Sequence, residues 1–139
     1  MAPRQALVAV SVAQLAAGVA GQVIALRRHH PYDTPLMGGR PENVGRDSFL
    51  SGTALSAPVV MLAAQTWAVR RLHDRPSDGA RRALGGLGVA MVGGYLMERL
   101  CRARLTPGGL DRVETPVVVV GLLGAAAMGV LGHRDQAGR

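Results

Sequence analysis

The side chains that could carry chemistry gather in two polar segments of the chain, residues 27–47 and 98–114. Both segments are rich in arginine, whose guanidinium group can grip a carboxylate or phosphate through two parallel N–H donors. The pattern predicts a site for a molecule with an anionic or polar head group. The alternative is a solvated rim whose arginines bind membrane lipid phosphates. The expected ligand-binding residues in these segments are Arg27, Arg28, Tyr32, Arg46, Arg102 and Asp111.

Glu98 is the strongest candidate for a catalytic group, because it ends an apolar segment in which an ionisable side chain is costly. With arginines nearby, we expect its carboxylate to stay ionised near neutral pH and to act as a base. An ion pair with Arg102, four residues later on the same helical face, is the alternative. Tyr95, one helical turn before Glu98, and Asp33 complete the predicted catalytic set.

Gln14 and Gln22 place two amides inside an otherwise apolar segment. Polar groups at such positions are functional candidates, so we expect both to contribute to ligand binding. Gln65, in the next apolar segment, is a candidate of the same kind. Hydrogen bonding between helices is the alternative, since amide side chains join membrane helices at about 1 kcal/mol each.

The sequence predicts no metal site and leaves the cofactor unassigned. His29, His30 and Asp33 form the best histidine-containing group, but adjacent histidines rarely point at one ion. Cys101 is the single cysteine, which excludes an intramolecular disulfide and a cysteine-based zinc site within one chain.

The elements that must position these groups are four apolar segments. Hydrophobic residues make up 48% of the chain and aromatic residues only 3%, so the apolar character comes from Ala, Val, Leu and Gly rather than from the rings typical of soluble cores. Each segment is close to the length needed to cross hydrocarbon as a helix. We therefore predict an all-α, integral membrane four-helix bundle forming one domain over residues 1–139, with spans at about 5–26, 48–69, 83–100 and 115–132.

Two of these segments carry unusual features. Pro58 lies in the middle of the second segment, where a membrane helix tolerates proline if neighbouring groups satisfy the freed carbonyl. The first segment could instead be a cleaved secretory signal, because small residues at 17–20 resemble a cleavage site. Its apolar run continues past that point, which favours a full span.

The charge distribution favours a membrane over a nucleic acid as partner. The formal net charge is +7 and all 16 basic residues other than histidine are arginines. Nearly all lie between apolar segments, without interleaved aromatic side chains on which bases could stack. We expect a multi-pass protein of the bacterial cytoplasmic membrane with both termini on one side. Eight arginines fall on each side, so the positive-inside rule leaves the orientation open.

In outline the chain resembles the membrane-associated eicosanoid and glutathione metabolism family. Its length, its four apolar segments and a first segment that ends in residues 22–28 before a proline-rich loop are similar. The chain departs from the family where an Asn and a Glu would precede Pro58, since Gly52 and Leu55 stand there. The family's later Arg- and Tyr-rich stretch has only Tyr95, Arg99 and Arg102 as loose counterparts. The chain is therefore not assigned to this family.

Three classes of function fit these features. The first is an enzyme or binder of a lipophilic small molecule, with the apolar part held between helices and the polar head at the two polar segments. Stripes of small residues such as Gly121, Ala125 and Gly129 are expected to pack the four helices together. The second class is an accessory or assembly subunit that uses the small-residue faces left over to dock on a larger membrane complex, or a homo-oligomer formed in the same way. A small transporter is the third and needs a polar path that residues 116–132 do not offer.

Overall fold

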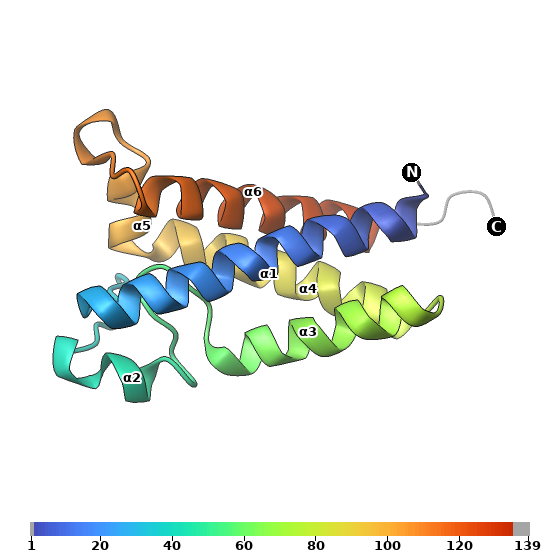
Figure 1. Ribbon diagram of the computed structural model, residues 1–139, viewed down its shortest axis with the longest axis horizontal. Helices are drawn as coiled ribbons and strands as arrows, with labels where there is room; N and C mark the ends of the chain where they lie inside the picture. The colour runs from blue at the N-terminus through green and yellow to red at the C-terminus, as the bar shows by residue number, and fades with distance from the viewer. Residues whose placement is uncertain (1, 135–139) are drawn as a thin grey trace.

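The computed structural model describes residues 2–134 and is helical throughout (Figure 1). Within that range there are six α-helices, two 3₁₀ turns at Pro41–Asn43 and Pro107–Gly109, and no β-strand. The all-α class predicted from the sequence is thereby confirmed. The α-helices are α1 (Pro3–Arg28), α2 (Val44–Asp47), α3 (Val59–Asp74), α4 (Asp78–Met97), α5 (Arg99–Arg104) and α6 (Glu114–His133).

Two helices, α1 and α6, are long and apolar enough to cross a membrane. They contain 26 and 20 residues, respectively. At 1.5 Å per residue they measure about 39 Å and about 30 Å, against a hydrocarbon thickness of about 30 Å. No other helix in residues 2–134 meets both the length and the hydropathy condition. The four-span arrangement is therefore not confirmed, although two of its predicted spans coincide with suitable helices.

The four long helices lie side by side, and each packs against two of the others (Figure 1). α6 contacts α1 and α4, and α3 completes the arrangement by contacting the same two helices. Close approach of α4 to α6 depends on glycine: a Cβ at Gly88 would lie 2.6 Å from the carbonyl oxygen of Ala125. Small residues thus allow backbone contact, as the sequence predicted for the α6 stripe.

The predicted helix over residues 48–69 is wrong in its first half. α3 begins at Val59, and Pro58 is its N-cap residue instead of lying inside the helix. Proline disfavours helical geometry in the residue before it, so the chain enters α3 from extended backbone. Gly52, with φ of +85°, makes a left-handed bend that glycine adopts without steric cost. Residues 48–58 are consequently turns and extended backbone.

The predicted third span, residues 83–100, has different limits and is interrupted. α4 starts at Asp78, where the Ser77 side chain accepts a hydrogen bond from the Ala80 N–H, and it ends at Met97. Glu98 then adopts extended geometry and precedes α5. In the described residues no ion pair joins Glu98 and Arg102, so the intrahelical pair considered above does not form.

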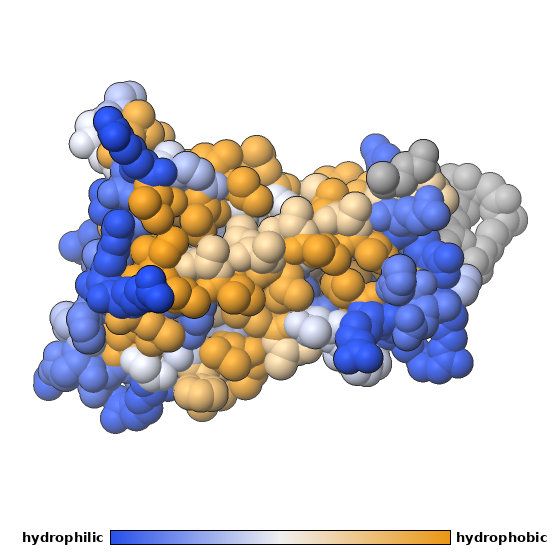
Figure 2. Space-filling model, in the orientation of Figure 1, coloured by the Kyte–Doolittle hydropathy of each residue, from blue (hydrophilic) through white to orange (hydrophobic). Residues whose placement is uncertain are grey.

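An apolar band covers the middle of the visible face, and polar residues lie at both ends of the long axis (Figure 2). Large hydrophobic side chains point outward from all four long helices. Val19 is 50% exposed, Trp67 60%, Val89 59% and Leu123 65%. Such a band is typical of a surface that contacts a membrane or another protein.

Candidate functional site

The first polar segment folds back onto the junction between α4 and α5. The backbone N–H of Asp33 donates to Glu98 Oε1 at 2.7 Å, and its carbonyl accepts from the Arg99 N–H at 2.9 Å. The Ala54 N–H donates to the carbonyl of His30 at 3.3 Å. Hydrogen bonds of His30, Asp33 and Ala54 therefore attach the first polar segment and the irregular residues 48–58 to this end of the molecule.

A cluster of charges closes that end around the fully buried side chain of Glu114. Arg28 Nη1 donates to Glu114 Oε1 at 2.7 Å, and His30 Nε2 lies 2.9 Å from the same oxygen. Arg104 Nε donates to the second carboxylate oxygen. One carboxylate thus joins α1, the first polar segment, α5 and α6, and its position in the first turn of α6 is favourable for a negative charge.

Asp111 takes part in the same region by accepting hydrogen bonds from backbone N–H groups at the start of α6. Its Oδ1 accepts from the backbone N–H groups of Val113 at 2.9 Å and Glu114 at 2.8 Å, and these bonds lower the pKa of Asp111. Arg28 lies 3.5 Å from its other oxygen. Two predicted ligand-binding residues, Arg28 and Asp111, are therefore engaged with protein groups.

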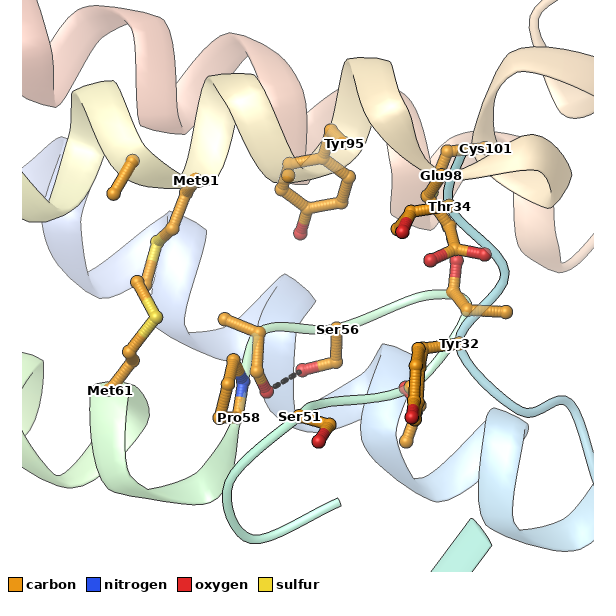
Figure 3. Close-up of a pocket in the computed structure, with 15 residues that line it drawn as sticks. Tyr32, Thr34, Ser51, Ser56, Pro58, Met61, Met91, Tyr95, Glu98 and Cys101 are labelled. Carbon is orange, nitrogen blue, oxygen red and sulfur yellow. Dashed lines mark hydrogen bonds between the residues drawn. The ribbon is translucent and has the colours of Figure 1, made fainter. Parts of the chain in front are cut away.

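A pocket of about 120 Å³ lies between α3, α4 and the irregular residues 51–58. Methionines 61 and 91 stand at one end of it, and Tyr32 and Glu98 at the other (Figure 3). Three of the predicted site residues line it together: Tyr32, Tyr95 and Glu98. The remaining lining residues are Thr34, Ser51, Thr53, Ala54, Ser56, Ala57, Pro58, Met61, Ala90, Met91, Gly94 and Cys101.

Glu98 is only 5% exposed and faces this pocket. Burial raises the pKa of its carboxyl group to about 7, and the Asp33 N–H opposes this shift only in part. No arginine forms an ion pair with this carboxyl group in residues 2–134, so the expectation that arginines hold it is corrected. The physical reason is that Arg28 and Arg104 point at Glu114 instead.

Tyr95 contributes its ring to the pocket and is 6% exposed. Its hydroxyl group has no hydrogen-bond partner in the described part of the chain and lies beside Gly121 of α6. The absence of a side chain at Gly121 makes room for the ring. Tyr95 is thus held by packing between α4 and α6.

The remaining charged candidates lie away from the pocket. Arg27, Arg46 and Arg102 are exposed and do not line it. The Asp33 carboxylate pairs with Arg99 at 3.3 Å on the surface, and only the Asp33 backbone touches Glu98. The structure therefore separates most of the predicted arginines from the predicted acid.

The buried glutamines join helices. Gln65 Nε2 of α3 donates to Gln14 Oε1 at 2.7 Å and to the carbonyl of Ser11 at 3.0 Å, both on α1. Gln22 is 8% exposed, and its Oε1 has no partner within residues 2–134. None of the three lines the pocket. For Gln14, the geometry agrees with the interhelical alternative.

Sequence reasoning missed several participants. Cys101 lines the pocket and donates from Sγ to the carbonyl of Ala54 at 3.1 Å. His30, Arg104 and Glu114 were seen as members of polar segments, but their convergence depends on tertiary structure. The sequence did offer one signal for this cluster. Glu114 stands immediately before the apolar run of α6, and acidic residues are favoured at helix N-termini. Within residues 2–134 no group of three or more His, Cys, Asp or Glu side chains is arranged to hold a metal ion.

No protein-family model matches the sequence, and no curated protein or solved structure matches it either. The outline resemblance to the eicosanoid and glutathione metabolism family gains no support from these comparisons. The pocket and the residues that surround it are the features of the molecule that bear on its function.

Proposed function

We propose that the protein crosses a bilayer four times, with α1, α3, α4 and α6 as its spans. The length and hydropathy of α1 and α6 support this arrangement, and α3 and α4 pack lengthwise beside them. With 16 residues, α3 reaches only about 24 Å. Residues 48–58 would complete the crossing, since irregular backbone is tolerated at membrane depth where protein covers it or where it lines a cavity.

The same arrangement gives a multi-pass protein of the bacterial cytoplasmic membrane. α1 begins at the end of the molecule where α6 finishes, which supports placing both termini on one side (Figure 1). The charge cluster around Glu114 and the beginning of the first polar segment would lie at the membrane surface opposite the termini. Reporter fusions to the C-terminus and to residues 75–78 should give the same topology signal, and opposite signals would exclude four spans.

As its function, we propose that the protein binds a small lipophilic molecule in the pocket between α3 and α4. The observation that carries this proposal is an apolar pocket that contains one buried acid, Glu98. A few polar groups in a mainly apolar cavity are typical of ligand sites. A carboxyl group with a pKa of about 7 can also exchange a proton near neutral pH, so proton transfer is the chemistry an enzyme would perform here.

The pocket opens at the side of the bundle. Ala90 and Gly94 line it and are exposed on α4, and Met61 on α3 is half-buried. A ligand would enter from the hydrocarbon layer of the membrane, and its apolar part would lie along α3 and α4. The predicted anionic head group is less suited to this pocket than an uncharged polar or positively charged group, because the acid lies inside it.

A matched pair of substitutions tests the pocket. Gly94→Leu adds a side chain to a residue that lines the pocket, whereas Gly93→Leu makes the same change at an exposed neighbour outside it. A Cβ meets no atom within 4 Å at either position. Protein purified in lipid nanodiscs should carry a co-purifying small molecule, measured by mass spectrometry of organic extracts. We expect the molecule in the wild type and Gly93→Leu but not in Gly94→Leu; equal retention in both variants would contradict the proposal.

The second candidate function is an accessory subunit of a membrane complex. Gly86, Ala90 and Gly94 recur every four residues and are exposed on α4, a pattern that favours close helix docking in membranes. Gly86 does not line the pocket. If a second protein chain co-purifies and Gly86→Leu removes it while the small molecule stays bound, docking is a separate function. If no chain co-purifies, this candidate falls.

A further inference from the structure

We infer that the pocket accepts a positively charged nitrogen, an ammonium group carried on an apolar chain. This inference rests on the proposed ligand-binding function and adds the chemical class of the ligand. It arises from the charge of the pocket, the nature of its walls and its size. Each of these properties points to the same kind of head group.

The charge of the pocket is the first argument. Glu98 is the one acidic side chain among the lining residues, and no Arg or His of the described chain lines the pocket with it. Among the described hydrogen bonds, its carboxyl group accepts only the one from the Asp33 N–H. A buried carboxylate without a cation is unfavourable, and a cationic ligand would supply the missing partner.

The walls are the second argument. The chain has two tyrosines, and both line this pocket, as Tyr32 and Tyr95. The face of an aromatic ring attracts a cation, especially where water is excluded. The thioethers of Met61 and Met91 complete a soft, uncharged lining at the opposite end (Figure 3). Rings and a carboxylate together form the environment in which quaternary ammonium groups are recognised.

The size is the third argument. A cavity of about 150 Å³ accommodates a molecule the size of benzene, so a pocket of about 120 Å³ has room for a small head group. A methylated ammonium group fills such a space, whereas a whole lipid does not. The attached chain would leave through the opening at Ala90 and Gly94, which face the surface of α4. The pocket therefore selects the head group and leaves the tail in the hydrocarbon.

The experiment uses two lining methionines as reporters. The protein, with its six methionines labelled at the methyl carbon, is placed in nanodiscs and titrated with dodecyltrimethylammonium. Dodecyl sulfate and dodecanol serve as probes of equal chain length with negative or no charge. We expect saturable shifts of the Met61 and Met91 methyl signals with the ammonium probe only. Assignment follows from Met→Leu variants.

Glu98→Gln removes the charge and keeps an acceptor for the Asp33 N–H, so we expect the affinity for the ammonium probe to fall about tenfold, the loss of one moderately strong contact. Glu42→Gln makes the same charge change at an exposed residue outside the pocket and should leave the affinity unchanged. Tyr32→Leu, which removes one ring, provides a second variant if Glu98→Gln does not fold.

The outcomes separate the two proposals. If all three probes shift the Met61 and Met91 signals equally and Glu98→Gln has no effect, the pocket binds lipophilic molecules but the cation inference is wrong. If no probe shifts these signals and no co-purifying molecule is found, both proposals fail. An equal loss of affinity in Glu98→Gln and Glu42→Gln would show attraction to the overall charge of the protein and would also overturn the inference.

Discussion

Two buried glutamates at the same end of the protein have opposite surroundings. Glu114 is fully buried and is met by Arg28, His30 and Arg104. Glu98 is almost as buried, yet the one hydrogen bond to its carboxyl group in residues 2–134 comes from a backbone N–H. The first carboxylate has its charge balanced by the protein and holds elements together. The second lacks such balance beside a pocket, as expected of a group that meets a ligand.

The largest effect should follow from breaking the balanced site. Glu114→Ala leaves two arginines without their shared partner, and removal of one member of a buried ion pair typically costs about 3 kcal/mol of unfolding free energy or more. Because Arg28 and Arg104 are partly exposed, we expect a loss close to about 3 kcal/mol. Thermal unfolding in nanodiscs, followed by the fluorescence of Trp67, measures the change. Glu98→Gln is the comparison and should not destabilise; equal losses would erase the contrast between the two sites.

A second variant disturbs the pocket without touching the charge cluster. A Cβ at Gly121 would overlap the ring of Tyr95, because this Cβ would lie only 2.7 Å from the Cζ atom of Tyr95. Gly121→Ala should therefore cost about 1–3 kcal/mol through overpacking and should shift the Met91 methyl signal. Gly93→Ala, where a Cβ meets open space, is the control. If the two variants unfold alike, Tyr95 is not fixed by α6.

The third test concerns protonation of Glu98. Its pKa is raised by burial to about 7 from an ordinary value of 4.5, so the folded state favours the neutral acid. The contribution of Glu98 to stability is then fully present below pH 4.5 and is lost as the pH rises from 4.5 through 7. Of the charged groups around it, the Asp33 carboxylate favours the neutral form of Glu98 and Arg102 opposes it. The Cys101 thiol, whose own pKa is raised by burial, stays uncharged in this pH range.

Infrared spectroscopy measures this titration directly. The carbonyl band of a protonated carboxyl group should disappear with a midpoint near pH 7 in the wild type and be absent in Glu98→Gln. The fall in thermal stability between pH 4.5 and 7 should become smaller in the same variant. A midpoint near 4.5 would mean that Glu98 is solvated and would remove the contrast with Glu114.

The helical class followed from hydropathy alone, because apolar segments free of charge predict helices whatever their partners. The limits of the second segment did not, since the bend at Gly52 and the helix start at Pro58 interrupt a run whose hydropathy is continuous. The extended backbone at Glu98, which ends α4 before α5, carried no clear local signal either.

The site was predicted in part. Tyr32, Tyr95 and Glu98 were all predicted as site residues, and all three line the pocket. The arginines were assigned to the same site because both polar segments contain them. Composition could not tell which acid the arginines would face, and the fold directs Arg28 and Arg104 to Glu114.

The smallest effect should come from the exposed ion pair of Asp33, and it decides whether that residue acts through its side chain or its backbone. Arg99 Nε lies 3.3 Å from the Asp33 carboxylate, and both side chains are exposed, by 76% and 43% respectively. Such pairs contribute about 0–1 kcal/mol, so Arg99→Ala should change the unfolding free energy by less than about 1 kcal/mol. The backbone bonds of Asp33 to Glu98 and Arg99 survive the substitution, and ammonium binding should too. A large loss of affinity in Arg99→Ala, measured by the Met61 signal, would instead give the Asp33 carboxylate the direct role that the sequence predicted.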